Sequence, residues 1–352
     1  MISICGDLKE PASDVCLQKC SPSRLSSSAP SATGVLSLEY DRVMSEGKDE
    51  VTPRRQNGRI SYHEDRDVSK LSEEARKMLK LVPIGYVPLP HQVGGHSYFD
   101  GQIGMLRKVG QPSMLYKPLQ AGSKGPRELA FYESVFSHDV TSLDVIRLRQ
   151  LIPCYYGTTV ITDQANTPIT FLKLEDITCG FHRPCIIDVK IGKRVWDDHA
   201  LQDKIDREKK KYPCQEVIGF RIVGMRVYQV TTSTYNFFDR HYGRSLGSEE
   251  AVFKEGLMYF FNNGDNVRLE VLPLILEQLQ PIYDWFESQT NYKLFATSLL
   301  IVYEGDISVK KCPEIRLVDF AHTYESSNSL DENFLFGLRK LKSLLESVAK
   351  QQ

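Results

Sequence analysis

The sequence predicts an α+β fold in which strands and helices both contribute to the core. The first observation is an apolar segment, 184–192 (PCIIDVKIG), whose length and β-branched residues are typical of a buried strand. The second is a pair of apolar segments, 295–303 and 315–319, separated by turn residues, which indicates two paired strands. The third is the helical spacing of apolar residues in 272–286 and 334–348.

Composition limits the kinds of partner that the chain can have. The 352 residues carry a formal net charge of −1, and 41% of them are hydrophobic. Such a chain can bury a core but has no overall field that attracts a polyanion, so any polyanion site must be a local cluster of cations. No apolar segment approaches the roughly 20 residues of a membrane helix. We expect neither nucleic-acid binding, nor a transmembrane segment, nor a signal peptide.

Residues 1–80 have the composition of a low-complexity tail. Serine and proline dominate 21–31 and charges crowd 46–66, so this segment has too little apolar surface to order itself. A short helix over 71–79 is the one element expected here, and we expect the folded part to begin near Val82.

The first candidate functional residue of the folded part is a lysine within an apolar segment. Residues 114–119 have a strand pattern that contains Lys117, and a helix is expected from about Arg127, with Glu128 in its first turn. A desolvated ammonium needs a partner, and a lysine paired with a helix glutamate holds nucleotide phosphates in kinases. The alternative is a surface lysine and a glutamate that suits the helix dipole.

The next expected strand, 169–174, ends at two carboxylates. Glu175, Asp176 and Ile177 follow it directly. A loop at this point is either a plain polar connection or a hinge whose backbone groups contact a nucleotide base.

The buried strand pattern of 184–192 contains two opposite charges. Residues i and i+2 of a strand project from one face, so Asp188 and Lys190 point into the same space. Burying charge is costly and is tolerated mainly where the charges are paired or perform chemistry. A structural ion pair is the alternative to a catalytic site.

A cationic helix is expected to follow, reaching Lys211, with Asp197 or Asp198 as its cap. Lys204, Arg207, Glu208 and Lys211 share one face at spacings of 3, 4 and 7. This face can bind several phosphates. It is alternatively a solvated helix with Leu201 and Ile205 packed inward.

An aspartate ends the last apolar strand segment. Asp319 follows Val318, and a carboxylate at that position either starts a turn or holds the magnesium that bridges nucleotide phosphates. His322 lies three residues further on, and Ser298 lies on the expected neighbouring strand.

Three ordered motifs resemble the inositol polyphosphate kinase family. They are Pro184-x-x-x-Asp188-x-Lys190-x-Gly192, Ser298-Leu299-Leu300 and Asp319-Phe320-Ala321-His322, and the resemblance runs from about His91 to the C-terminus. It is strongest to the multikinase branch. The resemblance implies a two-lobed kinase-like fold with antiparallel sheets in both lobes, 81–174 and 175–352. A hinge and a short substrate-binding helix, 197–211, complete that expectation.

The resemblance also implies a role for each candidate residue. ATP would contact Lys117, the hinge residues Glu175 and Ile177, and, at its ribose, Asp188. Lys190 and Asp319 would be catalytic, Asp319 with Ser298 at Mg²⁺. The inositol phosphate would contact Lys190, Lys204, Arg207, Lys211 and His322; Arg207 stands where multikinases can have an uncharged residue. No general base is assigned.

The implied activity is the ATP-dependent phosphorylation of inositol trisphosphate and tetrakisphosphate to pentakisphosphate. A kinase of inositol hexakisphosphate has the same motifs, and a non-catalytic scaffold of the same fold is a further alternative. Soluble inositol polyphosphates are the expected partners, and phosphoinositide headgroups present the same phosphates. The expected protein is a monomer of the nucleus and cytoplasm.

Overall fold

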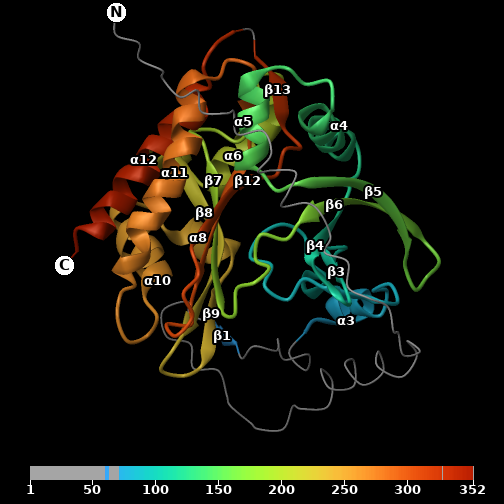
Figure 1. The fold of residues 1–352 in the computed structure, drawn as a ribbon, viewed down its shortest axis with the longest axis horizontal. Coiled ribbons are helices and arrows are strands. Elements are labelled where there is room, and N and C mark those ends of the chain that lie inside the picture. The colour runs from blue at the N-terminus through green and yellow to red at the C-terminus, as the bar shows by residue number, and fades with distance from the viewer. Residues whose placement is uncertain (1–59, 63–70, 327, 352) are drawn as a thin grey trace, which may run out of the picture. The chain divides into compact units, whose positions relative to one another are not determined.

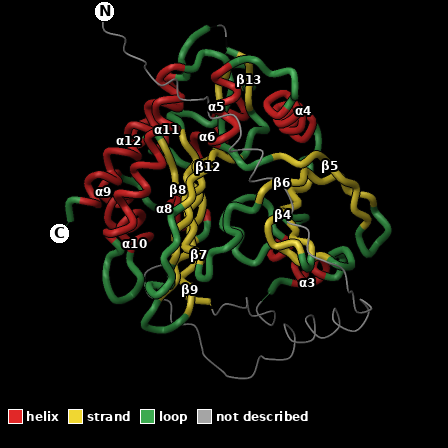
Figure 2. The backbone as a smooth tube through the Cα atoms, viewed as in Figure 1, coloured by secondary structure: helices red, strands yellow, loops and turns green. Residues whose placement is uncertain are grey.

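The computed structural model describes residues 60–62, 71–326 and 328–351, all within the second of the two compact units into which the chain divides, 46–352. The expectations for 1–59 and 63–70 therefore lie outside the described residues. Two sheets organise the described part, and most of its helices pack beside the larger sheet (Figures 1 and 2).

The smaller sheet has five antiparallel strands in the order β2-β3-β4-β6-β5. They are β2 (Tyr86–Pro88), β3 (Leu106–Lys108), β4 (Gln111–Pro118), β6 (Pro168–Glu175) and β5 (Tyr155–Thr162). Between β4 and β5 come α4 (Lys124–Phe136) and α5 (Leu143–Leu151). The expected helix near Arg127 is α4, and it begins three residues earlier.

The larger sheet has six strands in the order β1-β9-β8-β7-β11-β12 among the described residues, all pairs antiparallel. They are β1 (Ile60–Tyr62), β9 (Thr234–Phe238), β8 (Phe220–Gln229), β7 (Pro184–Ile191), β11 (Ser298–Glu304) and β12 (Glu314–Val318). The expected buried strand is β7. It lies between β8 and β11, and seven of its eight residues are buried, which agrees with its continuous apolar pattern.

Two long helices cover this sheet. They are α11 (Leu272–Ser288) and α12 (Glu332–Ala349), which pack on each other with Phe286 and Phe334 stacked 4.0 Å apart. None of the described helices has the length and apolar character that crossing a membrane requires.

The shorter elements are α3 (Glu73–Leu79), η2 (Tyr98–Asp100), α6 (Gln202–Lys211), α7 (Gln215–Ile218), α8 (Arg240–Ser245), α9 (Glu249–Ala251), η3 (Val252–Leu257), α10 (Met258–Phe261), η4 (Leu269–Val271), β10 (Tyr292–Leu294) and β13 (Thr323–Glu325).

Packed structure begins before Val82, which corrects the expected start. The helix expected at 71–79 is α3, and its Ala75 is fully buried. β1 pairs with β9 through the register Tyr62 to Tyr235. Both elements lie inside the segment that the sequence assigned to the tail. Short elements that are stabilised by packing on distant parts of the chain have little apolar pattern of their own, so the sequence did not reveal them.

The expected cap of the cationic helix is wrong. α6 begins at Gln202 after Leu201, which makes no side-chain cap. Asp197 instead accepts from the His199 amide at 3.1 Å and from Lys204 Nζ at 3.1 Å. Leu201 is 79% exposed, so it does not pack inward either. The helix is shorter because Asp197 is used in a turn of its own.

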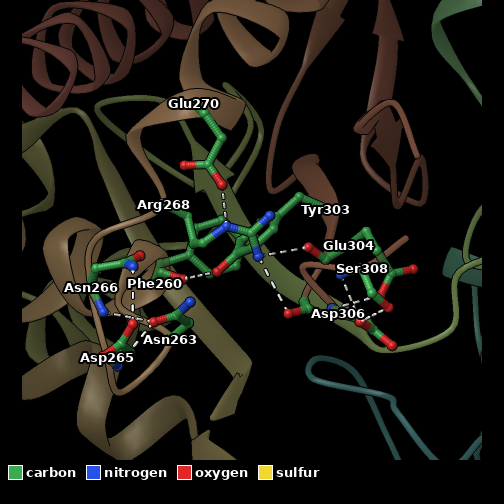
Figure 3. Close-up of polar contacts among 11 residues, drawn as sticks. Phe260, Asn263, Asp265, Asn266, Arg268, Glu270, Tyr303, Glu304, Asp306 and Ser308 are labelled. Carbon is green, nitrogen blue, oxygen red and sulfur yellow. Dashed lines mark hydrogen bonds and ion pairs between the residues drawn. The ribbon is translucent and has the colours of Figure 1, made fainter. Parts of the chain in front are cut away.

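The segment that joins the two sheets is anchored by a buried carboxylate. Glu304, at the end of β11, accepts hydrogen bonds from the backbone amides of His182 at 2.7 Å and Arg183 at 2.8 Å. Arg268 Nη1 donates to the carbonyl oxygens of Glu304 at 3.2 Å and Gly305 at 3.3 Å (Figure 3). The entry to β7, and with it Asp188, is thereby fixed.

Candidate active site

Asp188, Lys190 and Ser298 meet at the centre of the larger sheet. In the β7–β11 register Ser298 pairs with Lys190, and Leu300 pairs with Asp188. A register shift between Asp188 and Val189 lies on the side of β8. Side chains that are directly paired or two residues apart share a face, so the three polar groups project into one space.

Asp188 is a buried carboxylate with an unused oxygen. It is 6% exposed, and its Oδ1 atom has no hydrogen-bond partner among the described residues. Burial and the negative charge of Asp319 raise the pKa of Asp188 to about 6, against the opposing effect of Lys190. A buried, unpartnered acceptor of this kind suits a hydroxyl donor or a cation.

A glycine lies against Asp188. A Cβ atom on Gly94 would come within 2.1 Å of Asp188 Oδ2. The segment around it is held by Gln92, whose Nε2 donates to the carbonyl oxygens of Gly94 at 2.7 Å and His96 at 2.6 Å. The absence of a side chain at Gly94 therefore allows the chain to pass over the central carboxylate.

Lys117 connects the two sheets through two carboxylates. Its Nζ atom lies 2.6 Å from Glu128 Oε1 on α4 and 2.6 Å from Asp319 Oδ1 after β12. Burial alone would lower the pKa of Lys117, but Asp319 and Glu128 more than offset it and the pKa is raised. The Lys117–Glu128 pair considered from the sequence is thus present, and the surface-lysine alternative is wrong.

Asp319 occupies an unusual backbone position. Its φ is 68°, in the left-handed region that a residue with a side chain seldom adopts. Thr297 Oγ1 donates to the Asp319 carbonyl at 2.9 Å, and the Phe320 amide donates to Glu128 Oε1 at 3.2 Å. Lys117 lowers the pKa of Asp319, despite the opposing effect of burial, so the carboxylate is ionised. These contacts aim a charged oxygen at Lys117.

The oxygen donors here fit a magnesium ion. Ser298 Oγ is buried without a partner among the described residues, and it pairs in the β11–β12 register with Val318, which the ionised Asp319 follows. No group of three or more His, Cys, Asp or Glu side chains in the described residues is arranged to hold a metal. Magnesium is typically held by one or two protein carboxylates with water and phosphate, so this sparse set suits it.

A second region of the site is a cavity of about 490 Å³ with five cations in its lining. We call it the cationic pocket. Its lining residues are Ser123, Lys124, Arg127, Lys204, Arg207, Glu208, Lys211, His322 and Tyr324. Lys204, Arg207, Lys211 and His322 were expected from the sequence to share a substrate site, and they line this cavity together.

The cations of the pocket are only partly neutralised. Lys211 pairs with Glu208, and Lys204 pairs with Asp197 at 3.1 Å. Arg207 and Lys124 have no ion-pair partner among the described residues. The net charge therefore favours a ligand with several anionic groups.

His322 faces this pocket as a neutral ring. Burial, together with the positive charges of Lys204 and Lys124, lowers the pKa of His322 to about 4. Its Nδ1 atom is buried without a hydrogen-bond partner among the described residues. A neutral imidazole offers one donor and one acceptor nitrogen, which suits a hydroxyl or phosphate group.

Lys190 connects the two regions electrostatically. Its charge acts on Asp188, on Asp319 and on Glu208 of the cationic pocket. The β7–β8 register also pairs Lys190 with Arg221, which lies 3.8 Å from Glu208. A group held in the cationic pocket can therefore be near the Lys117–Asp319 pair.

The expected hinge residues lie at the end of β6. The Glu175 carboxylate accepts from the Cys154 amide at 3.1 Å, and the Glu175 amide donates to the Cys154 carbonyl at 2.9 Å. Ile177 is 8% exposed and packs in an apolar cluster with Val93, Ile186 and Val302. The Glu175 side chain is thus engaged by the Cys154 amide.

Sequence reasoning did not assign Lys124 and Arg127 to the pocket. Both lie in the first turn of α4, which contains no acidic residue. Cations in a first turn oppose the helix dipole, and this unfavourable placement is the sequence signal by which an anion site could have been found. Arg127 is held by Tyr324, with Nη1 2.9 Å from the hydroxyl.

Solved structures share this arrangement of sheets. The multikinase Ipk2 of Saccharomyces cerevisiae, solved with ADP and Mn²⁺, matches with a TM-score of 0.55 at 24% identity, covering 68% of this chain and 100% of that one. The fold is therefore the α+β, kinase-like class, as the sequence predicted.

Sequence comparison then gives the family. The family model for inositol polyphosphate kinase matches residues 171–346. Mouse inositol polyphosphate multikinase is 41% identical over 221 residues, which are 63% of this chain and 54% of the relative. Multikinase beta of Arabidopsis thaliana is 30% identical over 74% of this chain and 94% of its own. The chain belongs to the inositol polyphosphate kinase family.

The match to other branches is weaker. Human inositol hexakisphosphate kinase 3 is 30% identical over 51% of this chain. The chain spans about half the length of the mammalian multikinases it matches.

Proposed function

We propose that this chain is an ATP- and magnesium-dependent inositol polyphosphate multikinase that converts inositol trisphosphate and tetrakisphosphate to pentakisphosphate. One observation carries the proposal: a pocket with five cations is connected through Lys190 to the Lys117–Asp319 pair. Such a site can hold a phosphorylated acceptor beside a nucleotide. The greater similarity to multikinases than to hexakisphosphate kinases supports the choice of branch.

The nucleotide would lie between the two sheets. Lys117 would contact its phosphates, and the backbone of Glu175 and Ile177 its base. Asp188, whose Oδ1 atom needs a donor, would accept from the ribose. Asp319, with support from Ser298, would hold magnesium, which supplies charge neutralisation between the phosphates of the donor.

The acceptor would lie in the cationic pocket. Lys204, Arg207 and Lys211 would contact its phosphates, and the neutral His322 would contact a phosphate or hydroxyl. Lys124 and Arg127 extend this set from α4. A phosphoinositide headgroup carries the same phosphates, so it falls within the same proposed substrate class.

Catalysis would rest on positioning and on charge stabilisation. Lys190 would stabilise the charge that develops on the transferring phosphoryl group, and each charge-assisted contact contributes about 1.5–3 kcal/mol. Holding donor and acceptor in line supplies the remaining advantage. The ion pair of Lys117 with Asp319 pre-forms the donor end before the nucleotide binds.

The test is transfer of label from γ-labelled ATP to inositol trisphosphate, with and without magnesium. Labelled tetrakisphosphate should form with the wild type and be lost on magnesium removal and in Asp319→Asn. Equal labelling by Asp319→Asn would refute the assigned metal residue. Absence of labelled product with the wild type would refute the kinase proposal and favour the scaffold alternative.

A further inference from the structure

A second pocket, separate from the active site, lies at the segment that joins the two sheets. It measures about 460 Å³ and shares no lining residue with the cationic pocket. Arg107 on β3, Arg226 on β8 and Tyr235 on β9 contribute to it, together with the joining segment. Its full lining is Pro90, His91, Arg107, Pro112, Thr178, Cys179, Gly180, Phe181, His182, Pro184, Arg226 and Tyr235.

Arg226 is the unusual group in this pocket. Its guanidinium stacks on the Tyr235 ring at 3.6 Å, and its Nη1 atom makes a long contact of 3.5 Å to the Pro90 carbonyl. No ion pair joins Arg226 to a carboxylate among the described residues, and burial lowers its pKa. An anion beside this arginine would therefore stabilise its charge.

The other charged groups around the pocket are mostly paired. Arg107 is neutralised by Asp176, at 3.1 Å from Nε and 2.5 Å from Nη2, and His182 lies 2.8 Å from Asp306. Burial lowers the pKa of His91 to about 3, so its ring is neutral. The positive charge of Arg226 is therefore left over.

One further cation lies beside the pocket lining. Lys311 Nζ sits 4.9 Å from the centre of the Phe181 ring. Arg226, which lines the pocket, and Lys311 together favour an anion here.

The wall of the pocket is pre-formed. The backbone of His182 and Arg183 is fixed by the Glu304 carboxylate. The Asp306 amide donates to the same carboxylate, and Figure 3 shows Glu304 and Asp306. A rigid wall lowers the entropic cost of binding a ligand, because little has to be ordered on association.

We propose that this pocket is a second anion site, which binds the phosphate of a small phosphorylated molecule through Arg226. The aromatic face of Tyr235 holds the guanidinium plane, which leaves the Nη atoms as the donors for a phosphate oxygen. The volume exceeds that of inorganic phosphate, so an organic group can accompany it. The proposal concerns a surface other than the active site and does not depend on the proposed kinase activity.

The test is hydrogen–deuterium exchange of the full chain, with inorganic pyrophosphate as the probe and no metal present. Amide exchange in 179–184 and 226–235 should slow several-fold in the wild type. It should slow equally in Arg147→Gln, a matched exposed arginine on α5. Arg226→Gln should lose this protection and keep any protection at α6, and Arg226→Lys should recover only part of it.

Two results would overturn the proposal. One is protection confined to α6 and the Lys117 region in the wild type, a result that needs no variant. The other is an Arg226→Gln protein that keeps wild-type protection in 179–184. Neither result depends on turnover, so failure of this site and failure of the kinase proposal are separately visible.

Discussion

Three charged side chains, Lys117, Asp188 and Asp319, set the chemistry at the residue scale. Lys117 is 9% exposed at its side chain and Asp319 29%, so their ion pair is only partly screened by water. Asp188 has no such close cation, and its pKa rises accordingly. The three groups therefore differ in their response to mutation and to pH.

Lys117→Met should damage both activity and stability. Its removal leaves Glu128 buried and unpaired, which costs about 3–5 kcal/mol of unfolding free energy. It also removes a contact to the donor phosphates, so kcat/KM should fall about 10–150-fold. Urea unfolding and kinase assays provide the measurements. The control is Lys108→Met, which changes an exposed lysine on β3. Retention of wild-type stability by Lys117→Met would show that the pair is not structural.

Asp188→Asn should increase stability in a pH-dependent way. The folded-state pKa of about 6 lies above the ordinary 3.8, so the folded protein binds more protons between these values. Ionisation of Asp188 therefore costs stability as pH rises through this window, by at most about 3 kcal/mol above pH 6. Urea unfolding should show Asp188→Asn more stable than wild type at pH 7.5, and the difference should vanish near pH 4. A constant difference would contradict the raised pKa.

At the scale of elements, the strands that carry the motifs could be predicted from the sequence. β7 and β11 are largely buried and apolar, and β12 alternates buried Ile315 and Leu317 with half-buried positions, so pattern alone located them. The short elements β1 and α3 were assigned to the tail because their partners lie far away in sequence. The cap of α6 was assigned wrongly because Asp197 has a competing local use.

The site could be predicted only in part. Lys204, Arg207 and Lys211 share a helix face, which spacing reveals. Lys124 and Arg127 join them from α4, about 80 residues earlier in the chain, and the whole of the second pocket depends on similar long-range contacts. No local pattern fixes such distances, although the basic first turn of α4 was a usable signal.

Gly94→Ala should interfere with Asp188. The new Cβ would lie 2.1 Å from Asp188 Oδ2, so either the segment or the carboxylate must move. We expect a lower melting temperature and a higher KM for ATP, with a smaller effect on the acceptor KM. Gly247→Ala is the control, because its nearest atom is 3.9 Å away. A wild-type melting temperature together with a wild-type KM for ATP in Gly94→Ala would contradict this packing.

Arg207→Gln should weaken acceptor use selectively. Arg207 lines the cationic pocket without an ion-pair partner among the described residues, so its charge is available to substrate. Loss of one charge-assisted contact should lower kcat/KM for inositol trisphosphate about 10–150-fold and leave the KM for ATP unchanged. Lys210→Gln, on α6 but outside the pocket lining, should have little effect. Equal effects of the two variants would show that the helix acts through its total charge.

At the scale of the whole molecule, charge is concentrated locally. The net charge is −1, yet five cations line a single pocket. Long-range attraction is weak, and the proposed acceptor would be held by nearby charges that salt screens incompletely. The two sheets are joined at two places, by the Lys117–Asp319 ion pair at one end of β11 and by the segment anchored on Glu304 at its other end.

The KM for inositol trisphosphate should rise with salt between about 0.05 and 0.3 M, as the Debye length shortens. The slope of this rise should be smaller in Arg207→Gln, because fewer charges contribute. Steady-state kinetics at several salt concentrations measure both slopes. An identical slope in the two proteins would mean that the pocket does not hold the substrate phosphates.

The most direct test of the central claim is the identity of the products. The purified chain would be offered inositol trisphosphate and, separately, inositol hexakisphosphate, with ATP and magnesium, and products would be separated over time. The account predicts sequential conversion of trisphosphate to tetrakisphosphate and pentakisphosphate, with loss of all products in Asp319→Asn. Turnover of hexakisphosphate alone would contradict it and indicate the pyrophosphate-forming branch.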